Sequence, residues 1–329
     1  MKELLLNWHY RSKFEELILP SNRFIYNDKL VTFPNSAKQE KPIEFIYLEG
    51  GIWEKQTNDL EAKKTIELLQ SLYNSGKKSV GVIAINAKQC KLIRDLIETR
   101  DELCAWLEAK DENGLFVKNL ENCQGDERDT IIICASYAKD KDGKIGGRMF
   151  GQLNKENSEK RLNVMFSRAR EKVFLLSSLK SEQIQNPNQH KAIEFLKKYL
   201  TYAESGATNE GWKISANQNF KIDSDNFDSG FEESVCKALR NVGFEVESQV
   251  GCSGYKIDLA IICPNTQNYI LGIECDGEIY HSGKTARERD RLRQEILEKK
   301  GWKIHRIWGY DWLENKNEQI EKIKNLFMD

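Results

Sequence analysis

The first two hundred residues alternate short apolar runs with stretches in which apolar residues recur every three or four positions. Residues 79–85 form a continuous apolar run with the length of a buried parallel strand. Residues 59–74 have apolar positions at helical spacing, and Gly76 ends this predicted helix. The further predicted elements are buried strands at 130–136 and 173–177, one long helix from 87 to about 109, and helices at 158–170 and 188–201.

Buried strands separated by amphipathic helices are typical of an open α/β sheet with helices on both faces. From about 204 to 229 the chain becomes polar and rich in turn residues, which predicts a linker. We therefore expect a first domain at 1–204, a linker at 205–228 and a second domain at 229–329.

The last hundred residues predict a smaller α/β domain with the order helix, three strands, helix, strand, helix. The predicted helices lie at 231–242, 285–300 and 320–327, and the predicted strands at 244–250, 255–263, 269–276 and 302–308.

Composition narrows the classes of protein that fit these domains. The 329 residues carry a net charge of -1, which argues against a uniformly basic nucleic-acid coat. The eight cysteines form no C-x-x-C pair and only four histidines are present, so a structural zinc site is not expected. No apolar run reaches the length of about 20 residues that a membrane helix needs. We expect reduced thiols, a cytoplasmic location and no membrane partner.

Three segments of the first domain form a pattern. They are 6–12, which contains Arg11, then 122–129, which ends in Q-G-D-E-R-D, and 161–170, which reads R-L-N-V-M-F-S-R-A-R. Together these segments resemble superfamily 1 helicases. The resemblance implies the second of two RecA-like domains, in which these segments meet nucleotide and nucleic acid.

The resemblance also implies a role for each motif residue. Arg168 corresponds to the main arginine finger, with Arg170 as a supporting contact, and Arg11 corresponds to an arginine that reaches the γ-phosphate. Guanidinium groups suit this task because they meet the charge that spreads over the phosphoryl oxygens. The remaining cofactor-binding residues that the resemblance implies are Gln124, Gly125 and Glu127.

The phosphate cradle of such an ATPase is missing from this sequence. No G-x-x-x-x-G-K-[ST] motif occurs in the 329 residues. We therefore expect a C-terminal piece of a larger helicase that binds and hydrolyses ATP only together with an N-terminal RecA-like domain absent from this chain. Gln89 matches a further helicase position, although its neighbours do not.

Acidic residues gather on two predicted strands of the second domain. Strand side chains alternate between faces, so Asp258 shares a face of one strand with Lys256. Glu274 and Asp276 share a face of the next strand. Three carboxylates at one sheet edge would repel unless a hard cation bound them. We expect Mg²⁺ or Mn²⁺ there, held by Asp258 and Glu274, to activate a water for phosphodiester hydrolysis.

This pattern resembles the PD-(D/E)xK nuclease superfamily, in particular its very-short-patch-repair-like branch. The resemblance covers nearly all of 229–329 and implies a restriction-endonuclease-like fold. It adds an acidic residue on the first helix, Glu232 in preference to Glu233. Position 276 is Asp where the superfamily has lysine, so His281 is the preferred general acid or base and Lys256 the alternative.

The helix from 284 is locally basic. Residues 284–306 hold nine Lys or Arg against four acidic residues. Arg289 and Arg293 are four positions apart and share a helix face, where they can contact DNA phosphates. We expect an ATP-dependent DNA helicase–nuclease fragment whose C-terminal domain cuts DNA. The alternatives are a degenerate nuclease that only binds DNA, and an RNA helicase.

Overall fold

The computed structural model describes residues 8–37, 41–109, 114–146, 149–185, 190–205, 227–252, 254–277 and 284–327, with side chains omitted for 284–289. The chain divides into two compact units. The parallel-sheet unit comprises Glu16–Asn27 and Lys41–Lys213. The mixed-sheet unit comprises Met1–Glu15, Asp28–Glu40 and Ile214–Asp329. Each is described separately below.

The parallel-sheet unit is built on five parallel strands in the order β1-β7-β6-β4-β5. The strands are β1 (Ile43–Tyr47), β4 (Val80–Ala84), β5 (Phe116–Asn119), β6 (Arg128–Cys134) and β7 (Ala169–Ser177), with a short hairpin of β2 (Trp53–Glu54) and β3 (Thr57–Asn58). Every residue of β4 is buried, as expected of a central parallel strand covered on both faces.

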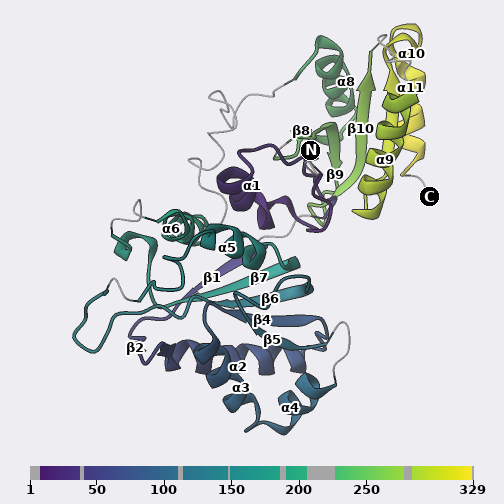
Figure 1. The fold of residues 1–329 in the computed structure, drawn as a ribbon. Coiled ribbons are helices and arrows are strands. Elements are labelled where there is room, and N and C mark those ends of the chain that lie inside the picture. The colour runs from purple at the N-terminus through teal and green to yellow at the C-terminus, as the bar shows by residue number, and fades with distance from the viewer. Residues whose placement is uncertain are drawn as a thin grey trace. The chain divides into compact units, whose positions relative to one another are not determined.

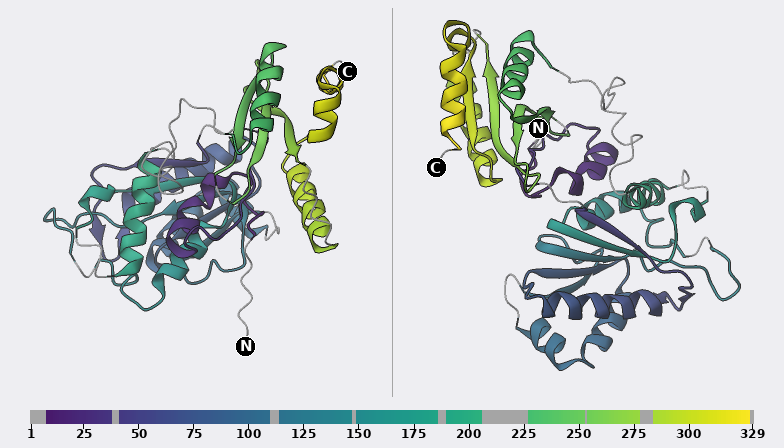
Figure 2. Two further views of the ribbon diagram at one scale, coloured as in Figure 1. Left: turned by 90° about the horizontal axis from the view of Figure 1, so that it is seen from above. Right: turned by 180° about the vertical axis from the view of Figure 1, so that it is seen from behind.

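Helices cover both faces of this sheet (Figure 1). On one face lie α2 (Asp59–Asn74), α3 (Ala87–Ile97) and α4 (Asp101–Glu108), and on the other lie α5 (Ser158–Phe166) and α6 (Lys191–Glu204). Helix α1 (Leu19–Ile25) packs against α5 and α6, and the chain also has short 3-10 turns η1 (Glu15–Leu17) and η2 (Ser181–Gln183). The rear view in Figure 2 shows α2 running along the strands.

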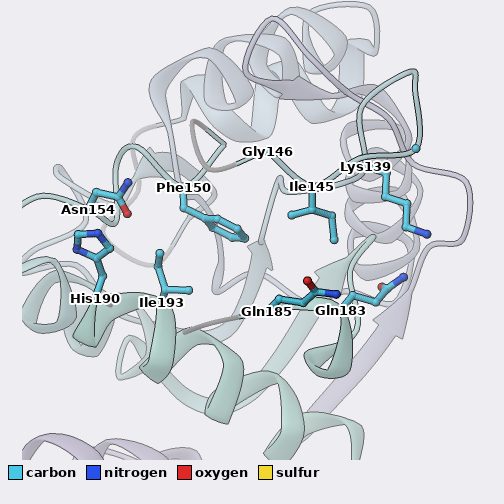
Figure 3. Close-up of a pocket in the computed structure, with 10 residues that line it drawn as sticks. Lys139, Ile145, Gly146, Phe150, Asn154, Gln183, Gln185, His190 and Ile193 are labelled. Carbon is cyan, nitrogen blue, oxygen red and sulfur yellow. The ribbon is translucent and has the colours of Figure 1, made fainter. Parts of the chain in front are cut away.

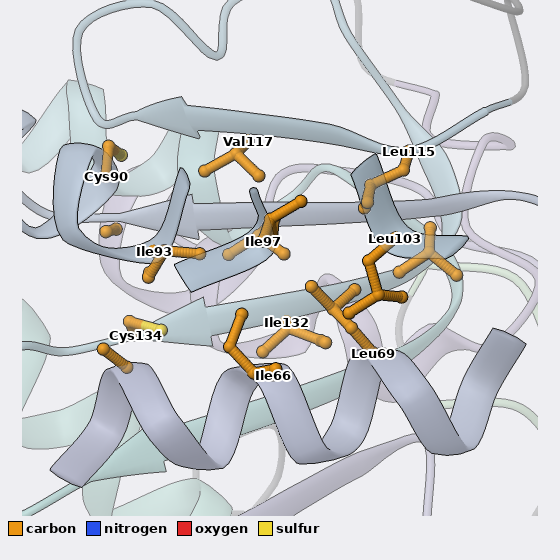
Figure 4. Close-up of a cluster of buried hydrophobic side chains, with 14 of the residues drawn as sticks. Ile66, Leu69, Cys90, Ile93, Ile97, Leu103, Leu115, Val117, Ile132 and Cys134 are labelled. Atoms are coloured by element: carbon orange, nitrogen blue, oxygen red, sulfur yellow. The ribbon is translucent and has the colours of Figure 1, made fainter. Parts of the chain in front are cut away.

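Periodic apolar positions on α2 and α3 explain this layering. Ile66 and Leu69 of α2 and Ile93 of α3 are buried against Ile132 of β6 in one cluster (Figure 4). The side chain of Asn58 accepts a hydrogen bond from the Glu61 amide and so caps α2. Gly76, with φ +74°, follows the helix end in the left-handed region that glycine tolerates best.

The predicted helix from 87 to 109 is wrong as a single element. The structure ends α3 at Ile97 and begins α4 at Asp101. The amides of Thr99 and Arg100 bond the carbonyls of Leu96 and Ile97, which tightens the backbone into a turn. The predicted helix at 158–170 also ends early, because β7 already begins at Ala169.

The mixed-sheet unit contains four strands in the order β11-β10-β9-β8. They are β8 (Glu245–Val250), β9 (Ile257–Ile262), β10 (Tyr269–Asp276) and β11 (Ile304–Trp308). Strand β9 runs antiparallel to both β8 and β10, whereas β10 and β11 are parallel. The helices are α8 (Gly230–Asn241), α9 (Lys284–Lys299), α10 (Gly309–Glu314) and α11 (Lys316–Asn325), of which α10 was not expected from the sequence.

Two apolar clusters lie on the two faces of this sheet. Leu259 and Ile273 pack with residues of α8, α10 and α11, including the buried Trp312. Ala260 packs on the opposite face with residues of α9 and with the buried Trp302. Ile257, at the start of β9, packs in the same cluster.

Residues 8–15 and 28–37 contribute to the mixed-sheet unit. Phe33 is fully buried in the cluster beside α9. The indole of Trp302 donates to the carbonyl of Pro34 at 2.9 Å, and the amine of Lys300 donates to the carbonyl of Ser12 at 2.6 Å. A Cβ on Gly254 would stand 2.8 Å from the Cα of Val31, so glycine permits this close approach.

The predicted fold class is confirmed: a parallel-sheet α/β unit and a smaller α/β unit with a mixed sheet. The predicted domain limits of 1–204, 205–228 and 229–329 stay a prediction. The compact units assign Met1–Glu15 and Asp28–Glu40 to the mixed-sheet unit.

Candidate functional site

The antiparallel pairing of β9 and β10 brings the two predicted metal ligands together. The register of β9 and β10 runs as far as Ile273 opposite Leu259, and Asp258 and Glu274 are the next residues of the two strands. They lie close enough for the charge of Asp258 to raise the pKa of Glu274. Glu274 lies on the α9 face, because its neighbour Ile273 packs on the α8 side and Tyr255, which packs on the α9 side, donates to it. Both carboxyl groups lie at the end of the sheet where β9 begins and β10 ends.

Each of these carboxyl groups is fixed by one short hydrogen bond. The amide of Cys275 donates to Oδ2 of Asp258 at 2.7 Å, and the hydroxyl of Tyr255 donates to Oε1 of Glu274 at 2.7 Å. A carboxylate has two oxygens and about four lone-pair positions. The bonds thus orient the groups and leave each of them capacity to bind a cation.

The electrostatics of the pair favour protonation when no cation is present. Burial, assisted by the charges of Glu232, Asp276 and Asp228, raises the pKa of Asp258 to about 6. Burial and then the charge of Asp258 raise the pKa of Glu274 to about 7. Ionising both neighbouring acids costs free energy, and carboxyl groups with such raised pKa values are common at functional sites.

Glu232, the predicted acidic residue of the first helix, lies close enough to Asp258 to raise its pKa. Glu232 is buried and accepts from the amide of Asp228 at 3.0 Å and from the side-chain amide of Gln249 at 2.9 Å. Glu233, the alternative, instead forms an ion pair with Lys237 in which the Lys237 side chain is 69% exposed. The structure therefore brings Glu232, and not Glu233, to the carboxyl pair.

Asp276 forms an ion pair with an arginine to which the sequence reasoning gave no role. Nε of Arg306 lies 2.8 Å from Oδ2 of Asp276. Arg306 stands on β11 in register with Glu274, and its charge lowers the pKa of Glu274. Thirty positions separate Asp276 and Arg306 in the sequence, so only the pairing of β10 with β11 reveals that they meet.

The structure describes some of the other predicted residues of this region and not others. His281 lies outside the described residues, and Arg289 lies on α9 with its side chain not described. The guanidinium of Arg293 lies 5.5 Å from the centre of the Tyr255 ring, which puts it on the same side as the carboxyl pair. Lys256 precedes β9 and is half-buried.

The donor set fits magnesium or manganese better than a metal that needs an all-protein cage. Among the described residues, no three His, Cys, Asp or Glu side chains are grouped to hold a metal ion. Mg²⁺ is commonly bound by one or two carboxylates, several waters and the substrate phosphate. Asp258 and Glu274 supply those two carboxylates, while Asp276 is engaged with Arg306.

A second constellation lies in the parallel-sheet unit, where the predicted nucleotide motifs meet. Arg168 is buried, and its guanidinium donates to the carbonyl of Val164 at 2.8 Å and to that of Asp126 at 3.5 Å. Nε of Arg170 lies 3.6 Å from a carboxylate oxygen of Glu127 and 3.6 Å from one of Asp129. The structure thus joins the 122–129 and 161–170 segments at the amino ends of β6 and β7.

The remaining residues of this constellation are differently placed. Gln124 and Gly125 form an exposed turn in which Gly125 has φ +92°. Arg11 is exposed and belongs to the mixed-sheet unit, whereas Arg168 belongs to the parallel-sheet unit. Gln89 is buried, and its side chain bonds both the amide and the carbonyl of Asn58, which is a structural role.

A separate pocket of about 500 Å³ opens in the parallel-sheet unit. Phe150 and Ile193 form part of its wall, with Lys139 at one side and His190 at the other (Figure 3). None of the residues predicted to bind nucleotide lines this pocket.

Comparison with known families decides what the parallel-sheet unit is. Residues 1–180 match the AAA-domain family. The chain belongs to this family. Residues 231–326 match a second family, described as REase_MTES_1575. The chain therefore joins a helicase-type AAA domain to a restriction-endonuclease-like domain, and the predicted resemblance to a helicase–nuclease fusion is confirmed.

Two curated relatives align with almost the whole AAA-family chain. It is 30% identical to the uncharacterized ATP-dependent helicase MG140 of Mycoplasma genitalium and 28% identical to the MG140 homolog of Mycoplasma pneumoniae. Both alignments cover 98% of this chain but only 29% of the relative.

A solved structure also matches part of the chain. It is the C-terminal domain of a possible DNA helicase from Lactobacillus plantarum, at 12% identity and a TM-score of 0.32, covering 51% of this chain and 86% of that one. None of the described helices combines the length and apolarity needed to cross a bilayer.

Proposed function

We propose that the mixed-sheet unit is a metal-dependent DNA endonuclease centred on Asp258 and Glu274. The observation that carries this proposal is the proximity of the two anchored carboxyl groups where β9 begins and β10 ends, with the pKa of each raised. Bound Mg²⁺ or Mn²⁺ would polarise the scissile phosphate and lower the pKa of the attacking water. Tyr255 and the Cys275 amide orient the two ligands, and Glu232 and His281 remain candidates for proton transfer.

The basic face of α9 supports a nucleic-acid substrate. Arg293 lies beside Tyr255, so a phosphate held by Arg293 and Arg289 would run past the carboxyl pair. The names of the helicase relatives also favour DNA or RNA as the partner. DNA is proposed because the nuclease-like family match accompanies the motor.

The parallel-sheet unit is proposed to be the second RecA-like half of an ATP-driven motor. Arg168, Arg170 and the 124–127 turn would complete a nucleotide site whose phosphate cradle lies in an N-terminal RecA-like domain, so the chain alone would not hydrolyse ATP. The relatives' greater length supports this proposal, since the chain spans 29% of each. A cytoplasmic location is proposed with it.

A cleavage assay on the whole chain tests the nuclease proposal. Labelled single- and double-stranded DNA and matched RNA are incubated with Mg²⁺ or Mn²⁺, using wild type, Asp258→Asn and, as a matched control, Asp311→Asn. We expect metal-dependent DNA cleavage that falls about a thousandfold in Asp258→Asn and is unchanged in the control. Intact DNA with wild type would leave the non-catalytic DNA-binding alternative, and preference for RNA would favour the RNA alternative.

A further inference from the structure

The carboxyl site has a charge problem that its two metal ligands do not solve. Phosphodiester cleavage concentrates negative charge on the attacking and equatorial oxygens, and a fixed cation near them lowers the barrier. Position 276, two residues beyond Glu274 on the same face of β10, holds an acid. Asp276 adds negative charge where the reaction needs positive charge.

Arg306 brings a cation to the end of that same side chain. Strands β10 and β11 are parallel, and the register pairs Glu274 with Arg306. Ile307 is buried in the cluster on the α8 side, so its neighbour Arg306 points to the opposite face, the face of Glu274 and Asp276. The Nε–Oδ2 distance of 2.8 Å then places the guanidinium at the tip of the Asp276 side chain.

The geometry of the ion pair suits an arginine that contacts substrate. The pairing uses Nε, and the guanidinium has two further nitrogens with four N–H donors in the same plane. Both partners are about one-third exposed, at 36% for Arg306 and 37% for Asp276, so the guanidinium is accessible to a phosphate. Its charge already acts on Glu274.

Resting on the endonuclease function proposed above, we propose that Arg306 is the cationic catalytic residue of this site and that Asp276 positions it rather than binding metal. Arg306 donates to the non-bridging phosphate oxygens as charge develops, and no bond to it forms or breaks. An ordinary surface ion pair would stabilise the fold by about 0–1 kcal/mol and do nothing else.

The test uses the whole chain with Mn²⁺ and a labelled DNA duplex. We expect Arg306→Met to lower kcat about a hundredfold with KM changed less than about threefold, because the lost donor acts mainly in the transition state. Arg306→Lys should keep about a tenth of the wild-type kcat, since lysine retains the charge without the planar fork. Lys322→Met, on α11, is the matched control and should cleave as wild type does.

A rescue experiment separates this role from simple stabilisation. In Arg306→Met/Asp276→Lys the cation sits directly on β10, and kcat should recover at least about tenfold over Arg306→Met. Calorimetric titration of Mn²⁺ without DNA should show Arg306→Met binding the ion within about threefold of wild type, whereas Asp258→Asn loses binding. This readout is independent of cleavage and also reports whether the variants are folded.

The possible outcomes test the role of Arg306, the role of Asp276 and the endonuclease function separately. If wild type cleaves and Arg306→Met cleaves equally well, the role of Arg306 is refuted while the endonuclease function stands. Weaker Mn²⁺ binding by Asp276→Asn, to the extent seen with Asp258→Asn, would make Asp276 a ligand and refute its positioning role. Failure of wild type to cleave with Mn²⁺ would refute the function and, with it, the inference.

Discussion

Both units bury a carboxyl group with a raised pKa, but the surroundings of these groups differ. In the parallel-sheet unit, Glu61 is fully buried, and burial raises its pKa to about 8. It accepts from the amides of Ser136 at 2.7 Å and Ser178 at 2.9 Å, and from the side chain of Asn58 at 3.0 Å. In the mixed-sheet unit, Asp258 and Glu274 each accept one hydrogen bond, and the charge of Asp258 acts on Glu274.

The difference indicates how a structural buried carboxyl group can be distinguished from one that binds a ligand. Glu61 ties together the segments that follow β6 and β7, so its hydrogen-bonding capacity is spent on the fold. The carboxylate oxygens of Asp258 and Glu274 can still accept further bonds, and the two groups repel each other in a way that a bound cation would relieve. A raised pKa alone does not separate the two cases, whereas the number of donors and the presence of a like charge do.

The largest effect is expected from Glu61→Ala. Removing the carboxyl group leaves several buried donors without an acceptor, and we expect the free energy of unfolding of the parallel-sheet unit to fall by about 3 kcal/mol. Urea denaturation, followed by hydrogen exchange at the amides of β6 and β7, measures it. Glu67→Ala on the same helix removes only an exposed pair with Lys64 and should cost less than about 0.5 kcal/mol. Equal losses in the two variants would remove the structural role of Glu61.

A smaller effect is expected at the predicted arginine finger. The buried guanidinium of Arg168 bonds main-chain carbonyls, so Arg168→Ala should destabilise the same unit by about 2 kcal/mol. Arg170→Ala breaks a longer, partly exposed contact with Glu127 and Asp129 and should cost less than about 0.5 kcal/mol. Thermal melting of both variants gives the comparison, and a larger loss for Arg170→Ala would contradict it.

Substitution in the carboxyl pair should change stability in the opposite direction, raising the free energy of unfolding at high pH. Asp258 and Glu274 have raised pKa values in the folded state, so the folded chain binds more protons than the unfolded chain. Stability contributed by these groups is therefore lost as pH rises from about 4 to about 7. At pH 8 and without divalent cations, Asp258→Asn should stabilise the mixed-sheet unit by about 1 kcal/mol, and at pH 4 it should not.

Denaturation curves at the two pH values measure this gain. Glu321→Gln, which removes an exposed partner of Lys324 on α11, is the control and should show no such pH dependence. Destabilisation by Asp258→Asn at pH 8 would mean that the pair is not under electrostatic strain.

Sequence patterns predicted those parts of the molecule that depend on local periodicity. The helix at 59–74 and the strand at 269–276 have the predicted limits, because an apolar period and a flanking cap or turn fix them locally. The break between α3 and α4 was missed, since Glu98, Thr99 and Arg100 include neither proline nor glycine.

The candidate site was predictable only as far as alternation within strands reaches. Asp258, Glu274 and Asp276 could be predicted to converge at one edge of the sheet. Arg306 could not be linked to Asp276, because that contact depends on the parallel pairing of β10 with β11. The packing of Phe33 and Pro34 beside Trp302 was missed for the same reason, since tertiary contacts across most of the chain leave no periodic signal.

Calorimetric titration of the chain with Mn²⁺ at pH 7, in two buffers of different ionisation enthalpy, tests the central claim most directly. The claim is that Asp258 and Glu274, whose pKa values are raised by burial, bind a divalent cation and lose protons as it binds. It predicts about one ion per chain, release of about one proton, and loss of binding in Asp258→Asn and Glu274→Gln but not in Glu61→Gln. Binding that survives both of the first two substitutions, or no binding by wild type, would contradict it.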